Sequence, residues 1–164
     1  MKFLPCHLRQ GKNYESCYLY PECTYTYGPP LAVAPIRNVR QVLEYALGII
    51  PPEKIFLGIP NYGYDWILPY VKGESMADSI SNVEAIQLAA RFGAEIQYDE
   101  TAQAPWFRYT DDEGKTHEVW FEDVRSIMQK FNLIKEKNLS GAGYWNIMRP
   151  FQQNWSLLDY LFEV

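Results

Sequence analysis

Histidine and cysteine are scarce in this sequence of 164 residues. Its two histidines are His7 and His117. The cysteines are odd in number and lack the spacing of a metal site: Cys6, Cys17 and Cys23. Zinc sites are built mostly from these two residue types, so a zinc site is not expected. We expect neither a metal nor another cofactor.

Basic runs and long apolar runs are missing as well. The net charge is −5, and no cluster of lysine or arginine marks a surface for nucleic acid. No segment approaches the roughly 18 apolar residues of a membrane span, so we expect no membrane partner. Near the N-terminus, Pro5 and His7 interrupt the apolar residues that a signal peptide needs, and none is predicted.

Aromatic residues, in contrast, are abundant. They make up 16% of the chain, with 13 tyrosines and 5 tryptophans. Flat aromatic faces suit sugar rings and partner surfaces, because they stack with little loss of side-chain entropy. A core rich in tyrosine would account for many of these rings equally well.

The most informative stretch is KIFLGIPNYGYDW, residues 54–66. Its apolar run predicts a short strand buried on both faces, as in a parallel sheet, and Pro60 ends the strand because proline has no N–H to donate. A polar and aromatic cluster follows at once: Asn61, Tyr62, Tyr64, Asp65 and Trp66. In α/β folds, ligands bind at the carboxyl ends of parallel strands. The cluster is equally consistent with a ligand site and with a well-packed strand end.

Helical and strand patterns alternate around this stretch. Apolar residues at helical spacing predict a helix over residues 36–50, which with the next strand forms a right-handed βαβ unit. The alternation resumes with a helix over 123–137, capped by Asp123, and a strand over 139–148. The expected fold class is therefore α/β.

An antiparallel insert separates these two parts. Ser81 and Glu84 form a capping box that predicts a helix as far as Phe92. Asp111–Gly114 lies between two alternating segments and predicts a β-hairpin.

Four blocks of the sequence together resemble one family. These are YGPPLAVAPIRNVRQVLEYA (27–46), KIFLGIPNYGYDW (54–66), HEVWFEDVRSI (117–127) and GAGYWNIMRPFQQNW (141–155). The chain resembles glycoside hydrolase family 18, the chitinase-like enzymes, and is closest to the bacterial spore-germination and spore-coat branch that acts on peptidoglycan. The resemblance implies a partial (β/α)8 TIM barrel, about strands six to eight, over residues 20–164, with a small α+β insertion over 67–122. Residues 1–19 are expected to be an atypical leader.

The resemblance also implies a sugar-binding groove. Trp145 matches the tryptophan that floors the subsite of the reacting sugar, and Tyr62 and Tyr64 match the aromatic turn after strand seven. Glu22 matches an acidic residue that helps to bind the distorted sugar. Trp66, from the same aromatic cluster, completes the expected substrate-binding set. A barrel core position is the alternative for Trp145.

The catalytic motif of the family is absent from the sequence. Family 18 hydrolysis is substrate-assisted: the N-acetyl group attacks the anomeric carbon while a glutamate, the last residue of D-x-x-D-x-D-x-E, protonates the leaving oxygen. The nearest carboxylates, Asp111–Glu113, have the wrong spacing, and the family's sixth-strand tyrosine aligns with Pro21. We expect no catalytic residue in this chain and no appreciable hydrolysis by it alone.

Three functions stay open at this point. The first is the C-terminal portion of a family 18 domain that acts on or binds GlcNAc-containing polysaccharide, peptidoglycan or chitin. The second is a non-catalytic carbohydrate-binding module, and the third is a gene fragment without function. A partial barrel exposes sheet edges, so we also expect a homo-oligomer or a leader that covers an edge. A spore-envelope or extracellular location follows from the resemblance alone.

Overall fold

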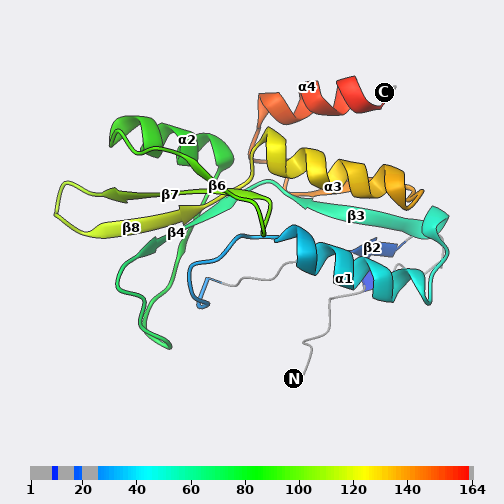
Figure 1. Ribbon diagram of the computed structural model, residues 1–164, viewed down its shortest axis with the longest axis horizontal. Helices are drawn as coiled ribbons and strands as arrows, with labels where there is room; N and C mark the ends of the chain where they lie inside the picture. The colour runs from blue at the N-terminus through cyan, green and yellow to red at the C-terminus, as the bar shows by residue number, and fades with distance from the viewer. Residues whose placement is uncertain (1–8, 11–16, 20–25, 163–164) are drawn as a thin grey trace.

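The computed structural model describes residues 9–10, 17–19 and 26–162, and within them the chain forms two β-sheets and four α-helices (Figure 1). The helices are α1 (Ile36–Leu47), α2 (Asn82–Arg91), α3 (Val124–Glu136) and α4 (Gln152–Leu161). A short 3-10 helix, η1 (Pro52–Lys54), leads from α1 into β3. The fold is mixed α/β, as expected.

The first sheet has the order β1-β2-β3-β9. Its strands are β1 (Arg9–Gln10), β2 (Cys17–Leu19), β3 (Ile55–Pro60) and β9 (Gly141–Trp145). β3 pairs in parallel with both β2 and β9, which confirms the parallel arrangement predicted for the strand at 54–60. β1 pairs antiparallel with β2, so β1 covers that edge of the parallel strands.

Alternation along β3 divides its side chains between two faces. Ile55, Leu57 and Ile59 are fully buried and belong to one core cluster with residues of α1 and α3, which run alongside the strand (Figure 1). On the other face, the register sets Gly58 beside Gly143 and Pro60 beside Trp145. Small residues thus precede the tryptophan on the face away from the helices.

Local signals set the helix boundaries. In α1, Val39, Leu43 and Ala46 share one face and are buried, and the helix ends at Leu47 rather than at residue 50. In α2, the capping box between Ser81 and Glu84 is present as predicted. Asp123 caps α3 and accepts a hydrogen bond from the N–H of Ser126, so this prediction is confirmed too.

The second sheet is antiparallel, in the order β5-β4-β8-β7-β6. Its strands are β4 (Gly63–Ile67), β5 (Asp78–Ile80), β6 (Gln97–Asp99), β7 (Ala104–Thr110) and β8 (Thr116–Trp120). The predicted hairpin around Asp111–Gly114 joins β7 to β8 and is confirmed. Gly63 is required where β4 meets β8, because a Cβ there would lie 2.6 Å from the Cβ of Phe121.

Each face of this sheet has its own cover. One face packs Phe107, Tyr109 and Val119 against Ala85 and Ala89 of α2. The opposite face packs aromatic residues of β4 and β8 against the segment that precedes α1, at Ala32 and Val33. Strand β4 therefore starts where the first sheet ends and continues into a separate core.

No helix in the part of the chain that the structure describes is long and apolar enough to span a membrane.

Candidate functional site

The candidate site lies where β3 and β9 end. Pro60 and Trp145 are the last register pair of the two parallel strands. From there the chain turns through Tyr62 into β4 of the second sheet, which pairs with β5 of the same sheet. A pocket of about 150 Å³ opens at this junction. Its lining consists of Tyr62, Tyr64, Ser79, Trp145, Asn146 and Arg149.

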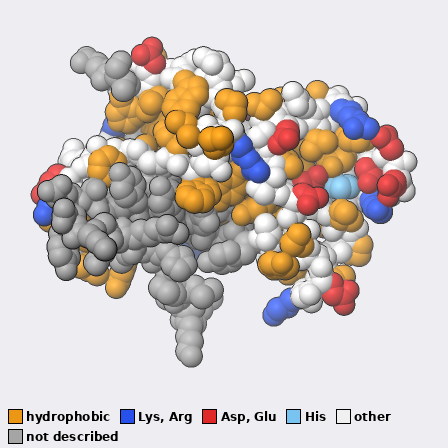
Figure 2. Space-filling model, turned by 180° about the vertical axis from the view of Figure 1, so that it is seen from behind, with side chains coloured by type: hydrophobic (Ala, Val, Ile, Leu, Met, Phe, Trp, Pro, Cys, Tyr) orange, Lys and Arg blue, Asp and Glu red, His pale blue; other side chains and the backbone are white. Residues whose placement is uncertain are grey.

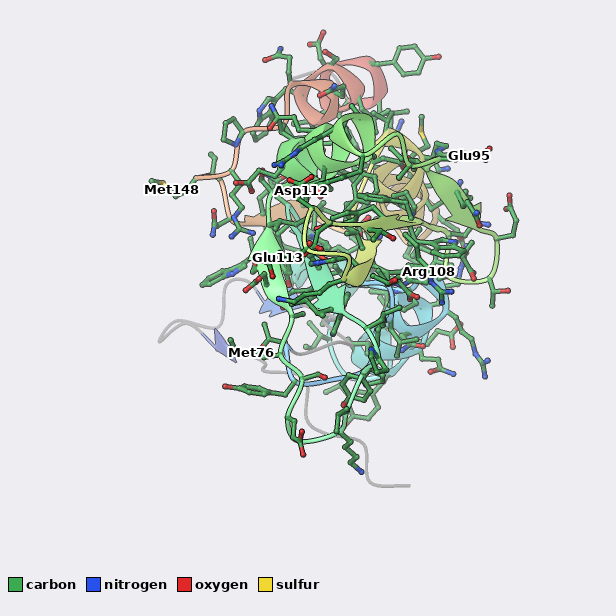
Figure 3. All side chains as sticks on the ribbon, turned by 90° about the vertical axis from the view of Figure 1, so that its left-hand side faces the viewer. Met76, Glu95, Arg108, Asp112, Glu113 and Met148 are labelled. Carbon is green, nitrogen blue, oxygen red and sulfur yellow. The ribbon has the colours of Figure 1, made fainter. Side chains whose placement is uncertain are left out.

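Trp145 offers the largest aromatic surface at the pocket, with 52% of the residue exposed. It is the last residue of β9 and is joined to Asn146 by a cis peptide bond. The segment after it keeps further apolar side chains at the surface, and Met148 projects outward from the ribbon in Figure 3. A half-exposed indole beside a polar pocket can stack on the C–H face of a sugar ring.

Tyr62 and Tyr64 lie in the same pocket as Trp145. They are far less exposed, at 5% and 8%. Their rings meet edge to face with centroids 5.4 Å apart, and Tyr64 meets Trp66 in the same way at 5.5 Å. Both tyrosines thus form the wall of the pocket, fixed by ring contacts, and Trp145 forms its open side.

Trp66 is placed differently from the expectation. The residue is fully buried, and its Nε1–H donates to the main-chain oxygen of Gly28 at 2.9 Å. It belongs to the core between β4 and the segment before α1. An indole without solvent-exposed surface cannot stack on a sugar, so Trp66 supports Tyr64 from behind and does not line the pocket.

Glu22, the remaining expected residue, lies outside the described residues. The lining that the structure describes therefore holds no carboxylate. A general acid must come within hydrogen-bonding reach of the leaving oxygen, and the described lining offers no carboxyl group for that role. The pocket as described can bind and orient a polar ring but offers no proton donor of the glutamate type.

Asn61 fixes the backbone around the pocket. This buried side chain donates from Nδ2 to the main-chain oxygens of Asn146, at 3.3 Å, and of Arg149. Its Oδ1 accepts a hydrogen bond from Nδ2 of the buried Asn82, and the N–H of Glu122 donates to Oδ1 of Asn82 at 3.0 Å. The segment after β9 is thereby tied to α2 and to the start of α3.

This network ends in a buried ion pair. Nζ of Lys130 lies 2.8 and 2.9 Å from the two carboxylate oxygens of Glu122, and Ser126 also donates to that carboxylate. Burial raises the pKa of Glu122, whereas the Lys130 ammonium opposes that shift. The pair holds α3 against the strand end and has no access to the pocket.

A second polar cluster lies on the α2 side of the second sheet. Tyr109 donates from its hydroxyl to Asp65 at 2.6 Å, and Nδ1 of His117 lies 2.9 Å from the same carboxylate group. Burial, followed by this contact with Asp65, raises the pKa of the Tyr109 hydroxyl. Nε2 of His117 also lies 3.3 Å from a carboxylate oxygen of Asp111. Figure 2 shows acidic side chains gathered at one end of the molecule. No group of three potential metal ligands occurs among the described residues.

Three residues of the pocket escaped the sequence analysis: Asn146, which directly follows Trp145, and the pair Arg149 and Ser79. Arg149 follows β9 by four residues, and its guanidinium donates to Ser79 and Ile80 of β5. Ser79 lies in a segment that reads as irregular from the sequence. No local pattern marks Arg149 or Ser79, because they meet only when the second sheet packs beside the end of β9.

Comparison with known proteins places the chain among glycosidases. The sequence matches the model of glycosyl hydrolases family 18 over residues 24–149. It is 56% identical to the cortical fragment-lytic enzyme of Bacillus subtilis over 143 residues, which cover 87% of this chain and 33% of that protein. The chain thus spans about a third of the length of this curated relative.

Solved structures show the same likeness. The spore cortex-lytic enzyme SleL of Bacillus cereus superposes with a TM-score of 0.87 at 46% identity, over 90% of this chain and 35% of that one. A chitinase from Chromobacterium violaceum gives a TM-score of 0.81 at 26% identity, over 90% of this chain and 45% of that one. The chain belongs to glycosyl hydrolases family 18.

Proposed function

We propose that this chain is a C-terminal portion of a family 18 domain and that its pocket binds GlcNAc-containing polysaccharide, with peptidoglycan as the favoured substrate. Family membership and the likeness to cortex-lytic enzymes support the substrate class. The observation that carries the proposal is the half-exposed Trp145 beside a polar pocket at the ends of two parallel strands.

In this proposal β2, β3 and β9 correspond to about strands six to eight of a (β/α)8 barrel. Two observations support it: the three strands are parallel, and α1 and α3 pack against one face of β3. The second sheet lies between β3 and α3 in the chain, which favours an α+β insertion over residues 67–122. The domain would then cover residues 20–164 together with β2, whose residues Cys17–Leu19 fall at the end of the expected atypical leader over 1–19.

The roles of the pocket residues follow from their exposure. Trp145 stacks on the sugar, and Tyr62 and Tyr64 shape the wall beside it. Glu22 keeps the role in sugar binding that the resemblance implies. We propose that the chain alone does not hydrolyse glycosides, since its described pocket presents no carboxylate to protonate the leaving oxygen.

The test is calorimetric titration of the full chain with GlcNAc oligomers and with soluble peptidoglycan fragments. The proposal predicts binding that Trp145→Ala abolishes. Tyr160→Ala removes a still more exposed aromatic ring from α4 and should leave affinity unchanged. Equal affinity of the Trp145→Ala variant and the wild-type chain would refute the assigned site. Turnover of either substrate that a mutation in this chain abolishes would refute the proposal of inactivity.

A further inference from the structure

Arg149 is the one charged side chain in the pocket lining that the structure describes. Its guanidinium is held in place by β5: Nη1 donates to Oγ of Ser79 and to the main-chain oxygen of Ile80, both at 2.9 Å, and Nη2 donates to the main-chain oxygen of Ser79 at 3.0 Å. The acceptors in these contacts are all neutral. The positive charge at the pocket is therefore fixed in position but not neutralised by them.

Part of the guanidinium's hydrogen-bonding capacity is unused. The group has five N–H donors, and the three contacts to β5 occupy three of them. Nε–H and one N–H of Nη2 have no acceptor among the described residues. Guanidinium groups bind carboxylates through two N–H donors at once, and such contacts are shorter and stronger than neutral ones.

Glu84, a carboxylate near Arg149, is already engaged elsewhere. No carboxylate in the described part of the chain forms an ion pair with it. Glu84 is close enough for Arg149 to contribute to lowering its pKa, but the main cause of that shift is the hydrogen bond from the Ser81 N–H. That bond, at 2.6 Å, belongs to the capping box of α2. The remaining donors of Arg149 are thus left for a ligand.

We propose that Arg149 determines specificity in this pocket by binding a carboxylate carried by the sugar. The inference rests on the proposed function and names its substrate more closely: muramyl sugars, which bear an acidic group, are preferred over neutral GlcNAc oligomers. The carboxylate comes either from the lactyl ether of the sugar or from a peptide attached to it. Trp145, in the same lining, supplies the stacking that both kinds of glycan share.

The experiment compares matched disaccharides on the full chain by calorimetry. The ligands are GlcNAc–MurNAc, its lactyl methyl ester, and GlcNAc–GlcNAc. We expect GlcNAc–MurNAc to bind about tenfold more tightly than the two neutral ligands, a preference that falls as salt screens the charge. A fourth ligand, with L-alanine on the lactyl group, moves the carboxylate outward. Tighter binding of this ligand assigns the contact to the peptide, and weaker binding assigns it to the lactyl group.

Variants identify the residue behind the preference. Arg149→Gln should bring the ratio between the affinities for acid and ester close to one. Arg149→Lys keeps the charge without the planar fork and should retain part of the preference. Ser79→Ala removes one contact to the guanidinium and keeps the charge, so this variant should retain most of the preference for the acid.

Two outcomes separate this inference from the function on which it rests. If the wild-type chain binds the acid and its methyl ester equally, the inference is wrong and the proposed function stands. If it binds none of the ligands, the proposed function itself fails. The comparison between acid and ester uses only the wild-type chain, so it decides the matter even where Arg149→Gln does not fold.

Discussion

The main-chain N–H of Asn61 donates to the main-chain oxygen of Trp145 at 2.9 Å. This bond continues the pairing of β3 and β9 by one residue beyond Pro60. The Asn61 side chain adds bonds to the segment that follows Trp145 and accepts one from Asn82 of α2. The exposed tryptophan therefore stands on a backbone held by buried amides.

Substituting Asn61→Ala tests this support. The change removes the side-chain bonds and leaves Nδ2 of Asn82 buried without its acceptor, so we expect a loss of about 2 kcal/mol in the free energy of unfolding. Binding of GlcNAc oligomers should weaken as the rim loosens. Urea denaturation measures the first effect. Asn132→Ala, at an exposed position of α3, is the control, and a similar loss in both variants would contradict the assignment.

The ion pair of Glu122 and Lys130 gives a second prediction. Both side chains are buried, so Glu122→Gln should destabilise the chain by about 3–5 kcal/mol because it leaves the ammonium without a counter-charge. The double variant Glu122→Leu/Lys130→Met should lose less than the single one. Thermal unfolding of the wild-type chain, the single variant and the double variant measures these differences in stability. A double variant less stable than Glu122→Gln would show that the pair is not the source of the effect.

A pH-dependent contribution to the stability of the fold is expected at the start of α2. The pKa of Glu84 is lowered, mainly by the hydrogen bond from the Ser81 N–H. A lowered pKa means that this stabilisation is complete above about pH 4.5, the ordinary value, and is lost as the pH falls through the folded-state pKa. Glu84→Gln should flatten the decline of stability between pH 5 and 3. Glu44→Gln, on the exposed face of α1, removes the same charge as a control. An unchanged slope in Glu84→Gln would contradict the prediction.

The place of β9 at the end of the described first sheet leads to a prediction about assembly. β9 is the last strand in the sheet order, with β3 as its one neighbour among the described strands. Unpaired strand edges favour association with another chain. We therefore expect sedimentation equilibrium to show a dimer or larger species that dissociates on dilution. A stable monomer across the concentration range would argue that the edge is protected in another way.

Local signals allowed the helices and turns to be predicted, because each depends on residues close in sequence. The capping box at Ser81, the cap at Asp123 and the hairpin at Asp111–Gly114 are of this kind. The site is harder to predict. Tyr64 and Trp66 are two residues apart on β4 and share a face, yet only Tyr64 reaches the pocket, because the segment before α1 covers Trp66. Gly28 in that segment and Trp66 are 38 residues apart, so no local pattern records their contact.

The most direct test of the account records the tryptophan indole N–H signals of the ¹⁵N-labelled chain while a GlcNAc tetramer is added. The signal of Trp145, assigned with Trp145→Phe, should shift in a saturable way. The signal of Trp66, which is buried and bonded to Gly28, should stay in place. A saturable shift at Trp66 with none at Trp145, or no shift at either, would contradict the claim that the exposed indole at the end of β9 receives the sugar.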